Sequence, residues 1–205
     1  MAVITISRQF GAGGKTLGRR MADTLGYYYA DEDIIERAVV EIYVSSDGRK
    51  IFESEPVDTL KKFISKLNPF GTSLMELPLS DKERYIDGFK YVELLNLIIS
   101  KIAKDGNAVI VGRGGQYILN KSDDTYHVLL IAKEEDRIKF IEENYRASGA
   151  RAVQMIKRMD KRRANLFSYF RKKDYDDPTL YDLVINMSLL SIDKAQELVF
   201  KLING

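Results

Sequence analysis

The chain has 205 residues, 45% of them hydrophobic and 30% charged, which is typical of one globular domain and not of a disordered chain. Its formal net charge of +2 gives no general attraction to nucleic acid or to a membrane surface. With no cysteine and one histidine, the sequence excludes disulfides, a cysteine nucleophile and a zinc site built from these residues.

The first 43 residues predict two strand–helix units. An apolar run at residues 3–6 leads into a glycine-rich loop, and Leu17, Met21 and Leu25 then recur at the spacing of a helix face. Residues 27–30 predict a second strand. The segment DEDIIERAVVEIY at residues 31–43 predicts a second helix, because acidic residues favour a helix N-terminus.

The middle of the chain predicts an insertion and then a buried strand. Residues 45–87 contain turn-rich stretches and three of the four prolines, so we expect an insertion that is partly helical around residues 60–67. A helix is predicted at about residues 84–104. The following AVIVGRGG is apolar up to its glycines, which is typical of a strand buried in a parallel sheet.

The last part of the chain continues the alternation of helices and strands. We expect helices at residues 115–119, 133–149, 151–173 and 191–205, with strands at residues 126–132 and 183–188. Gly149 is expected to end the second of these helices, and Ser191 to be the N-cap of the last. This order predicts an α/β fold with a parallel, doubly wound sheet and a ligand site at the carboxyl ends of its strands.

The loop SRQFGAGGKTLG at residues 7–18 is similar to a phosphate-binding loop. That motif is G-x-x-x-x-G-K-[ST], and here Gln9 occupies the place of its first glycine. If Gly11-Ala12-Gly13 is aligned instead with the GAG of a nucleoside monophosphate kinase loop, Lys15 comes one residue late. The alternative is a glycine turn that packs a helix against the sheet and leaves Lys15 in solvent.

The composition of this loop nevertheless favours phosphate binding. Glycines let backbone N–H groups approach a phosphate, and the N-terminus of the following helix adds its dipole. Lys15 would reach the β- and γ-phosphates, Arg8 would supply a second cation, and the Thr16 hydroxyl would face Mg²⁺. The expected donor-binding residues are therefore Arg8, Gly11, Ala12, Gly13, Gly14, Lys15 and Thr16.

Three segments together resemble the cytidylate kinase-like family, relatives of bacterial cytidylate kinase within the P-loop nucleoside monophosphate kinases. They are ISRQFGAGGKTLGRRMADTLGYYYADEDII, AVIVGRGGQYIL and DKRRANLFSYF…YDLVINMSLLSI. The resemblance implies a three-layer P-loop kinase fold with a parallel sheet, an inserted acceptor domain and a mobile helical lid. We expect a single domain with its core at residues 1–44 and 88–205 and its lid at about residues 150–178.

The resemblance also implies residues that bind the acceptor. In cytidylate kinases an aspartate ends the second strand and an arginine six residues later contacts the acceptor phosphate, as do Asp31 and Arg37 here by position. Asp31 could instead be a helix N-cap, and Arg37 an ordinary helix arginine paired with Asp33 or Glu41. Arg113 matches the acceptor-binding arginine after the third strand; the alternative is a salt bridge that holds its loop.

The expected lid helix carries the remaining candidates. Asp160 and Arg163 stand in the D-x-x-R relation of the family's lid, but Ile156 replaces the arginine expected one turn before the aspartate. Arg158, Arg162 and Arg163 would stabilise the charge on the transferring group, and Asp160 would belong to the acceptor site. The alternative is that this basic stretch is a solvated surface.

These features predict a phosphotransferase that uses ATP and Mg²⁺ and acts on a small acceptor, most simply a nucleoside monophosphate such as CMP. The alternatives are a nucleotide-binding regulatory module without transfer activity and a P-loop kinase for a different small molecule. The chain start lacks a signal-peptide pattern, so we expect a cytoplasmic protein with no nucleic-acid or membrane partner. The Tyr- and Phe-containing insertion could form the surface of a homodimer.

Overall fold

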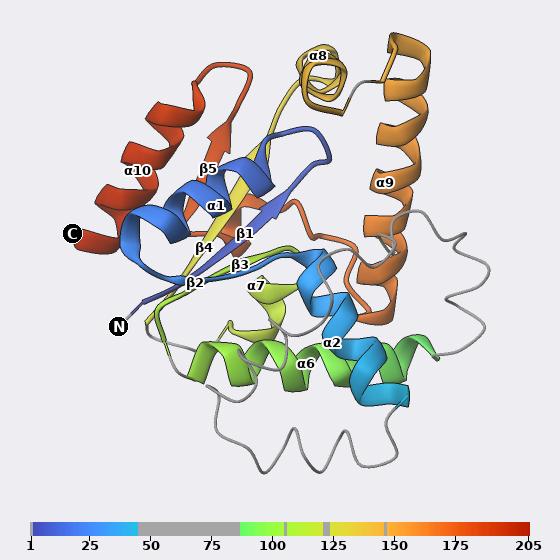
Figure 1. The fold of residues 1–205 in the computed structure, drawn as a ribbon, viewed down its shortest axis with the longest axis vertical. Helices are drawn as coiled ribbons and strands as arrows, with labels where there is room; N and C mark the ends of the chain where they lie inside the picture. Colours follow the sequence, from blue (N-terminus) through green and yellow to red (C-terminus); the bar gives the residue numbers. More distant parts are fainter. Residues whose placement is uncertain (1, 45–86, 105, 121–123, 146) are drawn as a thin grey trace.

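Figure 1 shows the fold in a computed structural model, which describes residues 2–44, 87–104, 106–120, 124–145 and 147–205. The predicted insertion, the helix expected around residues 60–67 and the dimer surface expected there lie outside the described residues. Among the described helices, none combines the length and the apolar character that crossing a bilayer requires.

One parallel sheet of five strands forms the centre of the fold. Its strands are β1 (Val3–Arg8), β2 (Tyr28–Ala30), β3 (Ala108–Val111), β4 (Thr125–Ile131) and β5 (Leu183–Asn186). They lie in the order β2-β3-β1-β4-β5, and every neighbouring pair is parallel. The predicted α/β class and parallel sheet are therefore confirmed, and the carboxyl ends of all five strands meet at one edge.

Helices cover both faces of this sheet (Figure 1). They are α1 (Gly14–Leu25), α2 (Glu32–Val44), α6 (Gly88–Lys104), α7 (Gly115–Ile118), α8 (Glu134–Tyr145), α9 (Gly149–Tyr169) and α10 (Ile192–Asn204). Side chains alternate along β1, so that Val3 packs with α2 and α6, whereas Ile4 and Ile6 pack with α1 and α10. Burial on both faces explains why β1 and β3 read as continuous apolar runs.

A third and smaller core joins α8 to α9. It contains the buried residues Ile141, Ala147, Ala152 and Ile156, and the partly buried Phe10 of the loop after β1 packs against it. Ile156, which replaces an arginine expected in the lid, is 2% exposed because it belongs to this core. The helix pair therefore packs against the loop at the carboxyl end of β1.

The boundaries of several elements differ from the expected ones, most clearly at the end of β1 and the start of α9. β1 continues to Arg8 because Ser7 and Arg8 pair with Leu129 and Leu130 of β4, although their polar side chains end the apolar pattern at residue 6. The expectation that Gly149 ends a helix is wrong: Ser148 is the N-cap residue of α9, and Gly149 is its first residue.

A Cβ atom on Gly149 would lie 3.2 Å from Glu142 Oε1, the end of a flexible and exposed side chain that can move aside, so this contact does not require a glycine at the start of α9. The other expected cap is confirmed, because Ser191 Oγ accepts a hydrogen bond from the backbone N–H of Lys194 at 3.3 Å.

The single histidine predicts a pH dependence of stability. His127 lies in β4, with its Nδ1 2.6 Å from Thr5 Oγ1, and burial lowers its pKa below the ordinary value. Between the folded and the ordinary pKa, the unfolded chain binds more protons, so the free energy of unfolding falls as the pH drops through about 6.5. Urea unfolding at pH 8 and pH 5 should show a smaller loss for His127→Gln than for the native protein; equal losses would contradict this origin.

Candidate active site

The loop between β1 and α1 has the backbone of an anion site. Gly11 and Gly13 adopt φ angles of 88° and 80°, and the N–H of Ala12 donates to the carbonyl of Gln9 at 3.1 Å. α1 begins after Gly13 with no side-chain hydrogen bond to its first N–H groups. These N–H groups and the helix dipole together can bind a phosphate.

Gln9, which replaces the first glycine of the motif, does not obstruct this loop. Its Oε1 accepts a hydrogen bond from the backbone N–H of Ala132 at 3.0 Å, next to the end of β4. The substitution therefore ties the loop to a neighbouring strand and leaves the space in front of α1 open.

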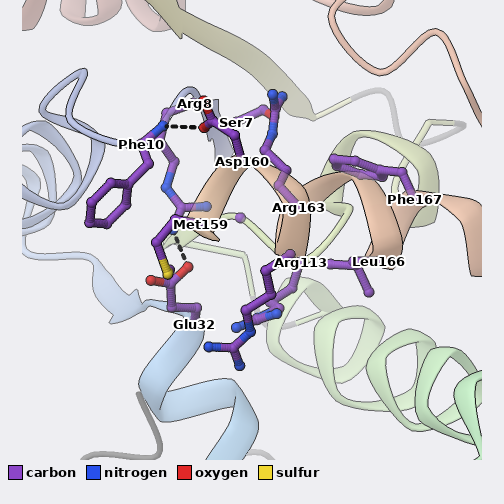
Figure 2. A pocket seen from close by; sticks show the side chains of 12 residues that line it. Ser7, Arg8, Phe10, Glu32, Arg113, Met159, Asp160, Arg163, Leu166 and Phe167 are labelled. Carbon is purple, nitrogen blue, oxygen red and sulfur yellow. Dashed lines mark hydrogen bonds and ion pairs between the residues drawn. The ribbon is translucent and has the colours of Figure 1, made fainter. Parts of the chain in front are cut away.

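Two pockets meet at this loop. The first, which we call the loop pocket, encloses about 330 Å³ and is lined by Arg8, Phe10, Gly11, Gly13, Gly14, Lys15, Thr16, Glu32, Phe140 and Tyr145. The second, which we call the lid pocket and which Figure 2 shows, encloses about 490 Å³. It is lined by Ser7, Arg8, Phe10, Glu32, Gly112, Arg113, Met159, Asp160, Arg162, Arg163, Leu166 and Phe167. Because Arg8, Phe10 and Glu32 line both pockets, two ligands could meet at these side chains.

Three carboxylates surround the ammonium group of Lys15. Its Nζ lies 2.5 Å from Asp33 Oδ2, 3.6 Å from Glu32 Oε1 and 3.7 Å from Asp31 Oδ2. Burial alone would lower the pKa of Lys15, but Glu32 and Asp31 outweigh it and raise that pKa. Lys15 is therefore a charged lysine at the wall of the loop pocket, held on one side by acidic residues of α2.

Arg8 and Glu32 form an ion pair at the boundary between the two pockets, where Figure 2 shows them side by side. Burial would raise the pKa of Glu32, yet the positive charges of Arg8, Arg113 and Lys15 hold it well below the ordinary value. Glu32 is therefore an ionised carboxylate, and Arg8 is positioned by it.

Gly112 leaves room for the Arg8 guanidinium. A Cβ atom on Gly112 would overlap Arg8 Nη1, and the φ angle of Gly112 is 83°. We expect Gly112→Ala to displace Arg8 and to lower turnover on the order of tenfold, because a charged hydrogen bond is typically worth about 1.5–3 kcal/mol. Steady-state kinetics with ATP as the varied substrate measure this. Gly26→Ala is a control: it also has a positive φ, but its Cβ meets no atom within 4 Å.

Two arginines from different elements converge on Glu36 of α2. Arg113, between the glycines after β3, donates through Nη2 to Glu36 Oε1, and Arg162 Nη2 of α9 lies 2.5 Å from the same oxygen. Arg113 is 8% exposed and has a φ of 58°, an uncommon conformation for a residue with a side chain. Glu36 thus holds both guanidinium groups at the wall of the lid pocket.

Arg163 of α9 is held by several neighbours. Its Nη2 donates to Ser7 Oγ at 3.1 Å and to Asp176 Oδ1 at 2.6 Å, and its guanidinium lies 4.8 Å from the centre of the Tyr175 ring. Asp160, one turn earlier, accepts a hydrogen bond from the backbone N–H of Phe10 at 3.3 Å (Figure 2). The D-x-x-R pair of α9 therefore contacts both Ser7 and Phe10.

Most of the residues predicted from the sequence line the two pockets. These are Arg8, Gly11, Gly13, Gly14, Lys15, Thr16, Arg113, Asp160, Arg162 and Arg163. Ala12 is buried beside the loop and lines neither pocket. Arg158 is exposed on α9 and also lines neither pocket.

The two candidates taken from the end of β2 have local partners. Asp31 is the N-cap of α2: its Oδ1 accepts from the N–H groups of Asp33 and Ile34, both at 3.1 Å. Arg37 Nε donates to the carbonyl of Asp33 at 3.2 Å, and Arg37 lines neither pocket. Both residues therefore have local contacts. Asp31 is connected to the loop pocket through its ion pair with Lys15.

Sequence analysis missed Glu32, Glu36, Phe10 and Arg137 as site residues. Glu32 and Glu36 are one turn apart on α2, and that spacing was a usable signal for one acidic face. Arg137 on α8 is 8% exposed and lies one turn before the buried Ile141, so its helix register could have indicated burial.

Two oxygen-bearing side chains near Lys15 would suit a magnesium ion, Thr16 and Asp33, although Asp33 itself does not line the loop pocket. Thr16 lines that pocket, and Asp33 Oδ1 is buried with no hydrogen-bond partner in the described part of the chain. The described residues contain no cluster of three or more histidine or acidic side chains arranged as a metal site. Magnesium commonly uses one or two protein oxygens together with substrate phosphates, and these residues can supply them.

Comparisons with known proteins agree with the fold. The sequence model of the cytidylate kinase-like family matches residues 3–189. An uncharacterized protein from Eubacterium ventriosum has a similar structure, with a TM-score of 0.68 at 17% identity over 100% of this chain and 99% of that one. A shikimate kinase from Bacteroides thetaiotaomicron has a TM-score of 0.53 at 14% identity over 100% and 99%. At these identities the likeness shows the P-loop kinase fold alone, and no curated protein matches the sequence significantly.

Proposed function

The chain belongs to the cytidylate kinase-like family, and we propose that it transfers the γ-phosphoryl group of ATP to a small-molecule acceptor. The observation that carries this proposal is the common wall of the two pockets. Arg8, Phe10 and Glu32 line both, so a donor in the loop pocket and an acceptor in the lid pocket would meet there.

The loop pocket is suited to the donor phosphates. The N–H groups at the start of α1 and the ammonium of Lys15 would bind them, and Thr16 and Asp33 would face the magnesium ion. When bound, magnesium neutralises the phosphate charge that develops during transfer. Lys15 is held by three carboxylates, so donor phosphates must compete with Asp33 for it.

The lid pocket is suited to an anionic acceptor. Arg113, Arg162 and Arg163 line it with three guanidinium groups, which match phosphate or carboxylate groups in shape and charge. A nucleoside monophosphate such as CMP is the simplest acceptor for a member of this family. An oxygen of the acceptor would attack the γ-phosphorus while ADP leaves, and Arg8, Arg162 and Arg163 would stabilise the charge on the transferring group.

The α9 helix would act as the lid over this pocket. It contributes Met159, Asp160, Leu166 and Phe167 to the pocket wall besides Arg162 and Arg163, and closure of such a helix excludes water, which limits hydrolysis of ATP. Arg158 would then serve only if closure brings it inward.

Incubating the purified protein with ATP, Mg²⁺ and a panel of acceptors tests the proposal. The panel should contain CMP, the other nucleoside monophosphates and small hydroxyl-bearing carboxylic acids, with ADP production as the measurement. ADP formation that depends on CMP supports a cytidylate kinase, and formation that depends on another member supports a kinase for that molecule. If ATP binds but no acceptor promotes ADP formation, the chain is a nucleotide-binding regulatory module and the transfer proposal is wrong.

A further inference from the structure

Both backbone polar groups of Phe10, in the phosphate loop, form hydrogen bonds with the α8–α9 pair. Its N–H donates to Asp160 Oδ1 of α9 at 3.3 Å, and its carbonyl accepts from Arg137 Nη1 of α8 at 3.3 Å. Its ring packs into the small core between these helices, 6.0 Å from the centre of the Tyr145 ring. The position of Phe10, which lines both pockets, is therefore set by α8 and α9.

Arg137 is the group that joins these contacts. The same Nη1 atom that binds the Phe10 carbonyl also donates to Asp160 Oδ2 at 2.7 Å. Arg137 is 8% exposed, and its Nε is buried with no hydrogen-bond partner among the described residues. Burying a guanidinium is costly unless it is paired and hydrogen-bonded. Because Arg137 would lose its bonds to Phe10 and Asp160 if it moved, this side chain has little freedom to move.

The packing of the loop on α8 is close at the next residue as well. A Cβ atom on Gly11 would lie 2.9 Å from the backbone oxygen of Arg137. The loop therefore lies directly against the turn of α8 that carries Arg137. A displacement of the Arg137 side chain would therefore shift Phe10 and Gly11, the two neighbouring residues that lead into the anion site.

We propose that Arg137 is a positioning residue, which holds the phosphate loop in the arrangement that binds the donor. It lines neither pocket, so it acts through Phe10 and not by contact with a substrate. This inference rests on the proposed function, because it requires the loop pocket to bind a nucleoside triphosphate. A salt bridge that only joined α8 to α9 would not need the contact with the Phe10 carbonyl.

The expected change in donor affinity depends on the fraction of molecules whose phosphate loop is in the arrangement that binds the donor. The apparent affinity of a ligand is reduced by the fraction of molecules whose site is formed. Loss of a charged hydrogen bond to the loop carbonyl, a contact typically worth about 1.5–3 kcal/mol, would leave roughly a tenth of the molecules competent or fewer. The dissociation constant of the donor should then rise about tenfold.

The test is the binding of Mg²⁺ and AMP-PNP, a non-hydrolysable ATP analogue, measured by titration calorimetry at a temperature where circular dichroism shows each variant folded. Arg137→Gln should raise the dissociation constant about tenfold. Arg137→Lys keeps the charge opposite Asp160 with a shorter side chain, so its value should lie between those of the native protein and Arg137→Gln. Lys139→Gln is the matched control, because it removes an exposed positive charge from the same helix.

The outcomes separate this inference from the proposed function. If the native protein does not bind AMP-PNP, the proposed function is wrong, and the inference about Arg137 falls with it. If the native protein binds it and folded Arg137→Gln binds equally well, the inference is wrong, whatever its change in thermal stability. Should Arg137→Gln not fold, Arg137→Lys decides: an unchanged dissociation constant would overturn the proposal, and a raised one would support it.

Discussion

Lys15→Ala is expected to bind ATP about a hundredfold more weakly than the native protein, a loss of about 3 kcal/mol. Two effects add. The variant lacks the ammonium group that would bind the donor phosphates, and it also leaves Asp33 and Glu32, at 2.5 Å and 3.6 Å from Lys15 Nζ, without that positive charge. Asp33 would then repel a triphosphate, whereas Glu32 keeps its ion pair with Arg8.

Calorimetric titration of the variant with Mg²⁺ and AMP-PNP measures this change. Lys172→Ala is the control, since Lys172 is exposed after the end of α9 and lines neither pocket; its affinity should stay within about twofold of the native value. Equal affinities for Lys15→Ala and Lys172→Ala would remove Lys15 from the donor site and would favour the interpretation of the loop as a glycine turn.

Arg113→Met is expected to lower kcat/KM for the acceptor by about ten- to a hundredfold and to leave the affinity for ATP unchanged, because a hydrogen bond to a charged group is typically worth about 1.5–3 kcal/mol. Arg113 lines the lid pocket and not the loop pocket, so only acceptor binding should suffer. Glu36 keeps Arg162 as a partner in this variant, which limits the loss of stability from an unpaired buried carboxylate.

Kinetics with the acceptor varied at saturating ATP would show this effect. Arg151→Met, on the exposed surface of α9, is the matched control and should behave as the native protein does. If Arg113→Met keeps its kcat/KM but loses thermal stability, Arg113 is only the salt bridge that holds the loop after β3, which was the alternative drawn from the sequence.

Several predictions drawn from local patterns were confirmed. The alternation of strands and helices predicted the parallel sheet, and the glycine-rich segment lies as a loop between β1 and α1, with positive φ angles at Gly11 and Gly13. Ser191 was predicted as an N-cap and is one. These features depend on neighbours in the chain, so residue type and spacing suffice to predict them.

Where a boundary depended on contacts between distant segments, prediction failed. Ser7 and Arg8 extend β1 only because β4 lies beside them, and α9 begins at Gly149, where the sequence had predicted a helix end. The role of Gln9 was equally hidden, since its partner Ala132 is at the end of another strand. A sequence pattern does not carry the position of such partners.

The candidate site shows the same difference between features set by local sequence and features set by contacts between distant segments. Chain order and residue type alone determined that Lys15 and Arg113 lie at the carboxyl edge of the sheet, because parallel strands bring their following loops to one edge. Only the tertiary structure decided which charges meet: Glu36 with two arginines from β3 and α9, and Arg137 with Phe10 and Asp160. These ion pairs and hydrogen bonds join residues from 23 to 127 positions apart, and their geometry depends on how helices pack, which local periodicity does not encode.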